Sequence, residues 1–289
     1  MQFLKLCHTA VLLIFCLFAL PGYSQGSLVL VNVTVTDPLN RYVDGLQKNH
    51  FRLYENNVVR PITYFEQQSV PITMVVACEV TEGLADMYKQ CRYGIRRYLE
   101  SANAQDEFIL VAFDKRSLMV EKASREKSDV EDIRPLGQVN GVSYLEEAIY
   151  AGLNRIKGKA GKKALVLVSK ADPGTISQEF DTADRAWKLS EHPEFQVYSI
   201  QEGSPPQSAR GKKSGNEPQR KTYVSSTEEV GYYLDLIYDE LRNQYVLGFP
   251  AAASKPALKN RKISVAIDRP RGLPKLRAKS GKGYYSPQP

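Results

Sequence analysis

The chain has 289 residues, with 39 Lys and Arg against 32 Asp and Glu, and a formal net charge of +7. This length allows one large domain or a core domain with appendages. The acids are spread among the bases, and the cations do not cluster with aromatic residues, so we expect no nucleic-acid partner.

The first residues are typical of a secretory signal peptide, which we place at residues 1–24. Residues 1–9 carry one cation and no acid, residues 10–20 are an unbroken apolar run, and Pro21 precedes small residues. A membrane anchor is the alternative, but the apolar run is shorter than the ~20 residues of a spanning helix. We therefore expect an exported chain, either periplasmic or extracellular.

Removal of residues 1–24 leaves two cysteines, Cys78 and Cys91. Cys78 ends an apolar strand and Cys91 lies about two turns into the next helix, which predicts a Cα separation beyond the ~7 Å limit of a disulfide. We expect two buried thiols. The remaining histidines, His50 and His192, lie far apart in the sequence, so histidine-based catalysis or metal binding is not favoured.

Residues 25–70 are predicted to form an N-terminal β segment. Apolar and polar residues alternate over 28–36, and further strands are expected at 51–54 and 61–65. Turn residues separate them.

From Pro71 onward, near-continuous apolar strands alternate with amphipathic helices. This pattern predicts an α/β fold over residues 71–245, a doubly wound, mostly parallel sheet with helices on both faces. The ligand crevice of such a sheet lies beyond the carboxyl ends of its strands, here residues 79–83, 141–143 and 169–172. The expected strands are 72–78, 108–113, 164–168, 195–200 and 223–224, and the expected helices are 84–101, 145–156, 180–189 and 227–244.

Residues 203–222 are rich in Pro, Gly, Ser and cations and are predicted to be a flexible insertion. The basic run 210–221 is a possible contact with an anionic surface. After it, residues 246–289 are predicted to form a C-terminal β segment.

Ordered sequence blocks resemble VWA-related (von Willebrand factor type A) proteins of the acidobacterial type. The blocks are VNVTVTD and FRLYEN, then GVSYLEEAIYAGL and KKALVLVS, then RNQYVLGF, RKISVAIDRP and GYYSP. The resemblance implies a VWA domain whose metal-ion-dependent adhesion site (MIDAS) follows the strand ends. An intact site has a DxSxS motif, a Thr and a further Asp, which together hold Mg²⁺ or Mn²⁺ through oxygen ligands.

This sequence departs from that motif, and we predict a degenerate site without a metal. A lysine at a ligand position repels a divalent cation, so Lys170 could instead pair with Glu79; the alternative is that Lys170 points to solvent. The matching positions are Glu79 for the leading Asp, Thr81 and Gly83 for the two serines, Ser143 for the Thr, and Lys170 for the last Asp, with Asp172 two residues further on.

The sequence shows no nucleophile–base pair and no phosphate loop, so we expect neither enzymatic activity nor a small-molecule substrate. The favoured function is an exported module that binds a protein partner without a metal or other cofactor. One alternative is adhesion dependent on Mg²⁺ or Mn²⁺ through a non-standard site. Another is a structural or assembly component of the cell envelope.

Overall fold

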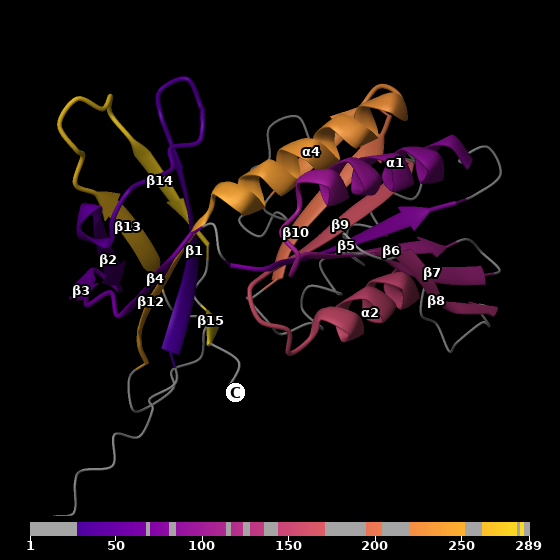
Figure 1. The fold of residues 1–289 in the computed structure, drawn as a ribbon, viewed down its shortest axis with the longest axis horizontal. Helices are drawn as coiled ribbons and strands as arrows, with labels where there is room; N and C mark the ends of the chain where they lie inside the picture. The colour runs from indigo at the N-terminus through magenta and orange to yellow at the C-terminus, as the bar shows by residue number, and fades with distance from the viewer. Residues whose placement is uncertain are drawn as a thin grey trace, which may run out of the picture.

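The computed structural model describes residues 28–67, 70–80, 85–113, 117–123, 128–135, 144–170, 195–203, 220–251, 262–281 and 284–285. These residues form an α/β unit and a smaller β unit, which lie side by side (Figure 1). Within the described part of the chain, no helix has the length and apolar character needed to cross a membrane.

The α/β unit is built on a seven-stranded sheet of order β11-β10-β9-β5-β6-β7-β8. The strands from β11 to β6 pair in parallel, and β7 and β8 extend the sheet by antiparallel pairing. The chain leaves β5 for β6 on one side and returns for β9 on the other, which makes β5 and β9 a topological switch point. The strands are β5 (Ile72–Glu79), β6 (Glu107–Phe113), β7 (Ser117–Ala123), β8 (Ser128–Pro135), β9 (Lys162–Lys170), β10 (Phe195–Glu202) and β11 (Arg220–Val224).

Helices cover both faces of this sheet, as the near-continuous apolar strands predict. Helices α1 (Ala85–Ser101) and α4 (Glu228–Asn243) lie on one face, and α2 (Tyr144–Ile156) lies on the other (Figure 1). Along β5, Met74, Val76 and Cys78 belong to the core under α1 and α4, whereas Val75 and Ala77 belong to the core under α2. Strand β5 therefore contributes to two hydrophobic cores.

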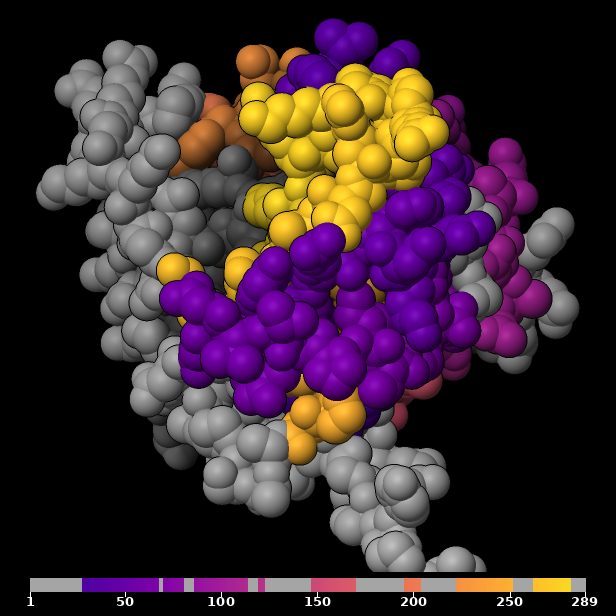
Figure 2. All heavy atoms as spheres, turned by 90° about the vertical axis from the view of Figure 1, so that its left-hand side faces the viewer, coloured from indigo at the N-terminus to yellow at the C-terminus, as the bar shows by residue number. Residues whose placement is uncertain are grey.

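The β unit combines strands from both ends of the chain. One sheet has the order β14-β1-β12-β4, with β15 also on β1, and a second has the order β13-β2-β3. Figure 2 shows the N-terminal (indigo) and C-terminal (yellow) residues packed against each other on this side of the molecule. The strands are β1 (Leu28–Thr36), β2 (Phe51–Glu55), β3 (Val58–Arg60), β4 (Tyr64–Glu66), β12 (Tyr245–Pro250), β13 (Ile263–Ile267), β14 (Arg277–Ser280) and β15 (Tyr284–Tyr285).

A separate hydrophobic core fills the β unit. The alternation of β1 places its valines at positions 29, 31, 33 and 35 on the buried face. The rings of Phe51 and Tyr245 lie 4.9 Å apart in the same core. The Tyr245 hydroxyl donates to the Val43 carbonyl at 2.9 Å and accepts from the Leu46 N–H at 3.0 Å, so its polar end is also satisfied.

Buried polar side chains join the two units where α4 leads into β12. One residue, Gln244, separates the end of the helix from the strand. Its side-chain amide donates to Gln196 of β10 at 2.7 Å and to Thr34 of β1 at 3.4 Å. Thr34 also donates to Glu240 of α4 at 3.3 Å. These contacts tie α4 to a strand of each unit.

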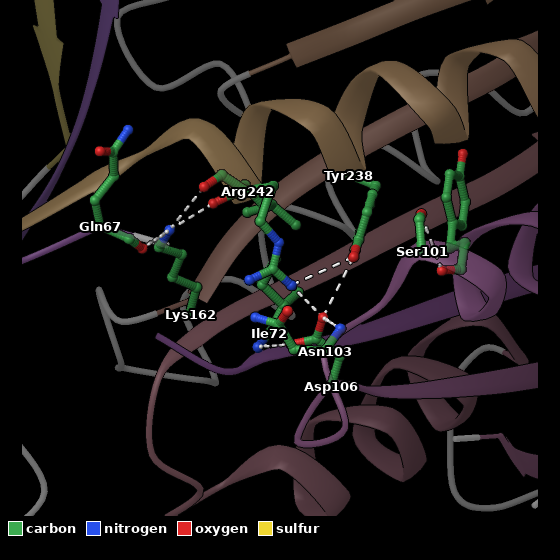
Figure 3. A network of polar contacts seen from close by, with 10 residues as sticks. Gln67, Ile72, Ser101, Asn103, Asp106, Lys162, Tyr238 and Arg242 are labelled. Carbon is green, nitrogen blue, oxygen red and sulfur yellow. Dashed lines mark hydrogen bonds and ion pairs between the residues drawn. The ribbon is translucent and has the colours of Figure 1, made fainter. Parts of the chain in front are cut away.

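A second polar cluster lies at the amino ends of the sheet strands, centred on Asp106 (Figure 3). This fully buried carboxylate accepts from the Ile72 N–H at 2.9 Å, the Asn103 N–H at 3.0 Å and the Tyr238 hydroxyl at 3.3 Å. It also forms an ion pair with Arg242 of α4. Asp106 thereby connects the starts of β5 and β6 to the end of α4.

Lys162, the first residue of β9, is also fully buried. Its ammonium group donates to the carbonyls of Leu241 and Gln244 at 2.7 Å each. It also donates to the Gln67 carbonyl at 3.1 Å (Figure 3). The last carbonyls of a helix lack intrahelical donors. Lys162 therefore supplies donors to the end of α4 and also holds the segment that leads from β4 to β5.

The structure confirms the predicted α/β class with a mostly parallel sheet and helices on both faces. Within the described residues it adds β3, β7 and β8, which the sequence pattern did not indicate. Strand β11 begins inside the predicted insertion 203–222, and β12 crosses the proposed boundary at 245/246. The expected helix 180–189 lies outside the described residues.

The buried ammonium group of Lys162 predicts a pH dependence of stability. Burial, and secondarily the charge of Arg242, lowers the pKa of Lys162 to about 7, with Asp106 acting in the opposite direction. The unfolded lysine keeps a pKa of about 10.4. Between these values the unfolded chain binds more protons, so the contribution of Lys162 makes the free energy of unfolding rise with pH.

We expect urea unfolding to show this rise between pH 7 and pH 9 in the native sequence and its loss in Lys162→Met. The variant also leaves helix-end carbonyls without a donor, at a cost of about 1–3 kcal/mol. Lys157→Met, at an exposed position just after α2, is the control and should keep the native dependence. Equal pH slopes in the native protein and Lys162→Met would contradict the assignment.

Candidate functional site

The candidate site lies at the carboxyl edge of the sheet, where β5 ends in Glu79. This residue is half-buried and pairs with Phe113 of β6. The Val80 N–H donates to the Phe113 carbonyl at 2.7 Å, so the pairing extends one residue beyond β5. The backbone that presents Glu79 is therefore held from the β6 side.

Strand β9 ends at the same edge, in Lys170. Cys78 of β5 pairs with Val168 of β9, and Lys170 pairs with Glu202 of β10. The main chains of Glu79 and Lys170 thus leave the sheet together at the switch point between β5 and β9. Doubly wound sheets bind ligands in the crevice at this point.

The other candidate positions, Thr81, Gly83, Ser143 and Asp172, lie outside the described residues. The structure places α2 directly after Ser143, because the helix begins at Tyr144. The roles given to these residues remain predictions.

The chemistry of the candidate ligands fits a divalent cation poorly. Mg²⁺ is bound through carboxylates and other oxygen atoms. In the correspondence expected from the sequence, Glu79 and Lys170 take the two aspartate positions of the motif, and a lysine carries positive charge where the motif has an anionic ligand. Among the described residues, no group of three His, Cys, Asp or Glu side chains is placed to hold a metal ion.

Two cysteines lie beneath this edge. Cys78 comes directly before Glu79, and Cys91 faces Cys78 from α1. Both are fully buried free thiols. The prediction of two buried thiols is confirmed. The sequence did not predict that their sulfur atoms would lie 3.1 Å apart. The reason is that α1 packs directly across β5, which brings its second turn over the end of the strand.

Sequence reasoning missed the buried polar residues at the opposite edge of the sheet. Asp106, Lys162 and Arg242 look like solvated charges in the sequence because each lies just outside an apolar run. Their position at element ends was the only signal available. The structure shows that their charged groups bind one another, a tyrosine or main-chain atoms, so they organise the fold.

No family model matches the sequence, and no relative was found among curated proteins. Solved structures similar to this one include a von Willebrand factor type A protein from Catenulispora acidiphila. It has 9% identity and a TM-score of 0.37, with 76% of this chain and 51% of that chain covered. Proximal thread matrix protein 1 from the mussel byssus, with a zinc-occupied MIDAS motif, has 9% identity and a TM-score of 0.36, covering 65% and 49%.

A secreted C11 cysteine protease from Bacteroides thetaiotaomicron is also similar, with 9% identity and a TM-score of 0.35, covering 46% of this chain and 45% of that chain. The matched part spans about half the length of these three proteins. The resemblance to VWA proteins concerns the fold alone.

The prediction that this chain is not an enzyme is corrected by the last comparison. Cysteine proteases are among the structures that resemble it. A scaffold of parallel strands and covering helices hosts both binding modules and enzymes, so it does not exclude catalysis.

The placement of α2 depends on the close approach of Gly152 to β5. Because α2 begins at Tyr144, this contact also positions the residue that follows Ser143. A Cβ atom there would lie 2.6 Å from Cγ1 of Val75 in β5. We expect Gly152→Ala to force the helix away from the sheet and to lower the free energy of unfolding by about 1–3 kcal/mol.

The matched control is Gly231→Ala in α4. The nearest atom to a Cβ there is Oε1 of Gln90 at 3.7 Å, an ordinary contact. This variant should gain about 0.5–1 kcal/mol from the lower backbone entropy of alanine. Urea unfolding of both variants checks the argument, and similar stabilities would show that α2 has room to move.

Proposed function

We propose that the chain is a VWA-type module that binds a protein partner outside the cytoplasm through the carboxyl edge of its sheet, without a bound metal. The observation that carries this proposal is the exit of Glu79 and Lys170 from neighbouring strands at the topological switch point. Doubly wound folds bind ligands at the switch point, and this chain places a carboxylate residue and an amine residue at the strand ends there.

The absence of a metal follows from charge. In an intact MIDAS a divalent cation balances several acidic ligands, and its open coordination position takes a carboxylate from the partner. Here Lys170 would supply positive charge and Glu79 would neutralise it, so the edge needs no ion to hold it together. Export rests on the signal-like residues 1–24.

The metal-dependent alternative makes the opposite prediction and is tested directly. We expect isothermal titration with Mg²⁺ and Mn²⁺ to give no heat of binding at micromolar concentration. Thermal unfolding should also be unchanged by either ion or by EDTA. Micromolar binding that is lost in Glu79→Gln would instead establish a functional, non-standard metal site.

A second candidate, a structural or assembly component of the envelope, is favoured by the surface of the β unit. Residues 269–281 contain five cations and no carboxylate, and these side chains are exposed. They extend along β14 and the connection before it. The cations are Arg269, Arg271, Lys275, Arg277 and Lys279.

Partner crosslinking distinguishes the two candidates. We expect Lys170→Glu to abolish the crosslinks made by the native chain in extracts of its own envelope, in the presence of EDTA, and Arg277→Glu/Lys279→Glu to retain them. The reverse pattern would favour the assembly role. Surface substitutions are preferable to deletion of residues 27–70, because β1 pairs with both β12 and β14 and its loss would disrupt the β unit.

A further inference from the structure

The cysteine pair beneath the candidate site has the placement of a disulfide. Cys78 is the last fully buried residue of β5, and Cys91 lies in the second turn of α1. Both side chains belong to the core between the sheet and α1. The Cys91 thiol donates to the Cys78 sulfur at 3.1 Å, so the two sulfur atoms point at each other.

The packed arrangement can hold the finished bond after only a small movement. A disulfide bond is about 2.05 Å long, so the sulfur atoms need to approach by about 1 Å. The end of a strand and the early turns of the following helix can provide that shift. The pair belongs to a hydrophobic cluster that includes Met74 and Met87, and this cluster would tolerate a disulfide in place of two thiols.

We propose that Cys78 and Cys91 form a disulfide when the chain folds in the presence of a disulfide-bearing oxidant, and that this bond ties the end of β5 to α1. The bond links residues 13 positions apart. It would join the end of β5 covalently to α1, across the whole β5–α1 connection. The export proposed above would supply an oxidising compartment, but the chemistry itself does not depend on the partner or on export.

The reaction is two successive thiol–disulfide exchanges. One cysteine thiolate attacks a sulfur of the oxidant, forms a mixed disulfide and expels the first thiolate. The second cysteine thiolate then attacks the cysteine sulfur of that mixed disulfide and releases the other half of the oxidant. The chain loses two protons and two electrons, and the oxidant is reduced to two thiols.

The timing follows from burial. Burial and the neighbouring Cys78 raise the pKa of Cys91 well above its usual value, which keeps it a thiol in the folded chain. Only thiolates attack disulfides. Oxidation therefore takes place before α1 packs on β5, and the finished bond is then protected from reductants by the same burial.

Trypsin gives a direct test, because it cuts between the two cysteines. Lys89 and Arg92 bound the peptide 90–92, which contains Cys91, and Cys78 lies in the peptide that ends at Lys89. The full chain is refolded with a mixture of oxidised and reduced glutathione, free thiols are alkylated under denaturing conditions, and the digest is analysed by mass spectrometry. We expect the two peptides to be recovered as one disulfide-linked species that separates on reduction.

Recovery of both Cys78 and Cys91 in alkylated form after refolding would overturn the proposal. A disulfide between either of them and Cys7 or Cys16 would also overturn it. Thermal unfolding supplies a second readout: the oxidised chain should melt roughly 5–10 °C above the reduced chain. In Cys91→Ala this difference should vanish. Identical melting temperatures of the oxidised and reduced native chain would also contradict a closing bond.

Discussion

A single buried ammonium group, that of Lys162, stabilises the connection between α4 and β12, where the chain passes from the α/β unit to the β unit. Helix α4 ends one residue before β12 begins, and the helix-end carbonyls have no donors of their own. Lys162 donates to two carbonyls of this turn and to the chain entering β5. Because β12 pairs with both β1 and β4, the contacts of Lys162 also fix where the β unit begins relative to the end of α4.

The two edges of the central sheet consequently have different roles. At the amino edge, Asp106 pairs with Arg242 and accepts from Tyr238, and Lys162 donates to main-chain carbonyls. A lysine with a strongly lowered pKa often marks a functional site, but structural networks lower it as well. Here the carbonyl contacts of Lys162 account for its burial, so chemistry is to be sought at the carboxyl edge, which the switch point also favours.

The sequence predicted the elements whose signal is local. Strands buried on both faces appear as apolar runs, such as residues 72–78, and the helices show the expected periodicity. It did not indicate β7 or β8, and the residues of β8, SDVEDIRP, are mostly polar or charged. The β unit was also hidden, because Leu28 pairs with Pro250 and no local pattern records so distant a contact.

The candidate site was predictable to a similar extent. Glu79 and Lys170 could be found from the sequence because the positions that matter follow the ends of apolar strands. The contact between Cys78 and Cys91 could not, because it depends on the rotation and crossing of α1 over β5, and spacing along the chain does not determine either. The cations of residues 269–281 went unnoticed for a different reason: net charge averages over the whole chain and hides a local run of cations without carboxylates.

The proposed loss of the metal and the proposed disulfide are connected by one physical requirement. A cation bound at the carboxyl edge would crosslink the segments that follow different strands and offset the entropy of ordering them. Without it, those segments need other constraints. A Glu79–Lys170 pair would act between the ends of β5 and β9, and a Cys78–Cys91 bond would shorten the free segment after β5. The proposed ion pair and the proposed disulfide would each restrict these segments as a bound metal would, and neither requires the ion.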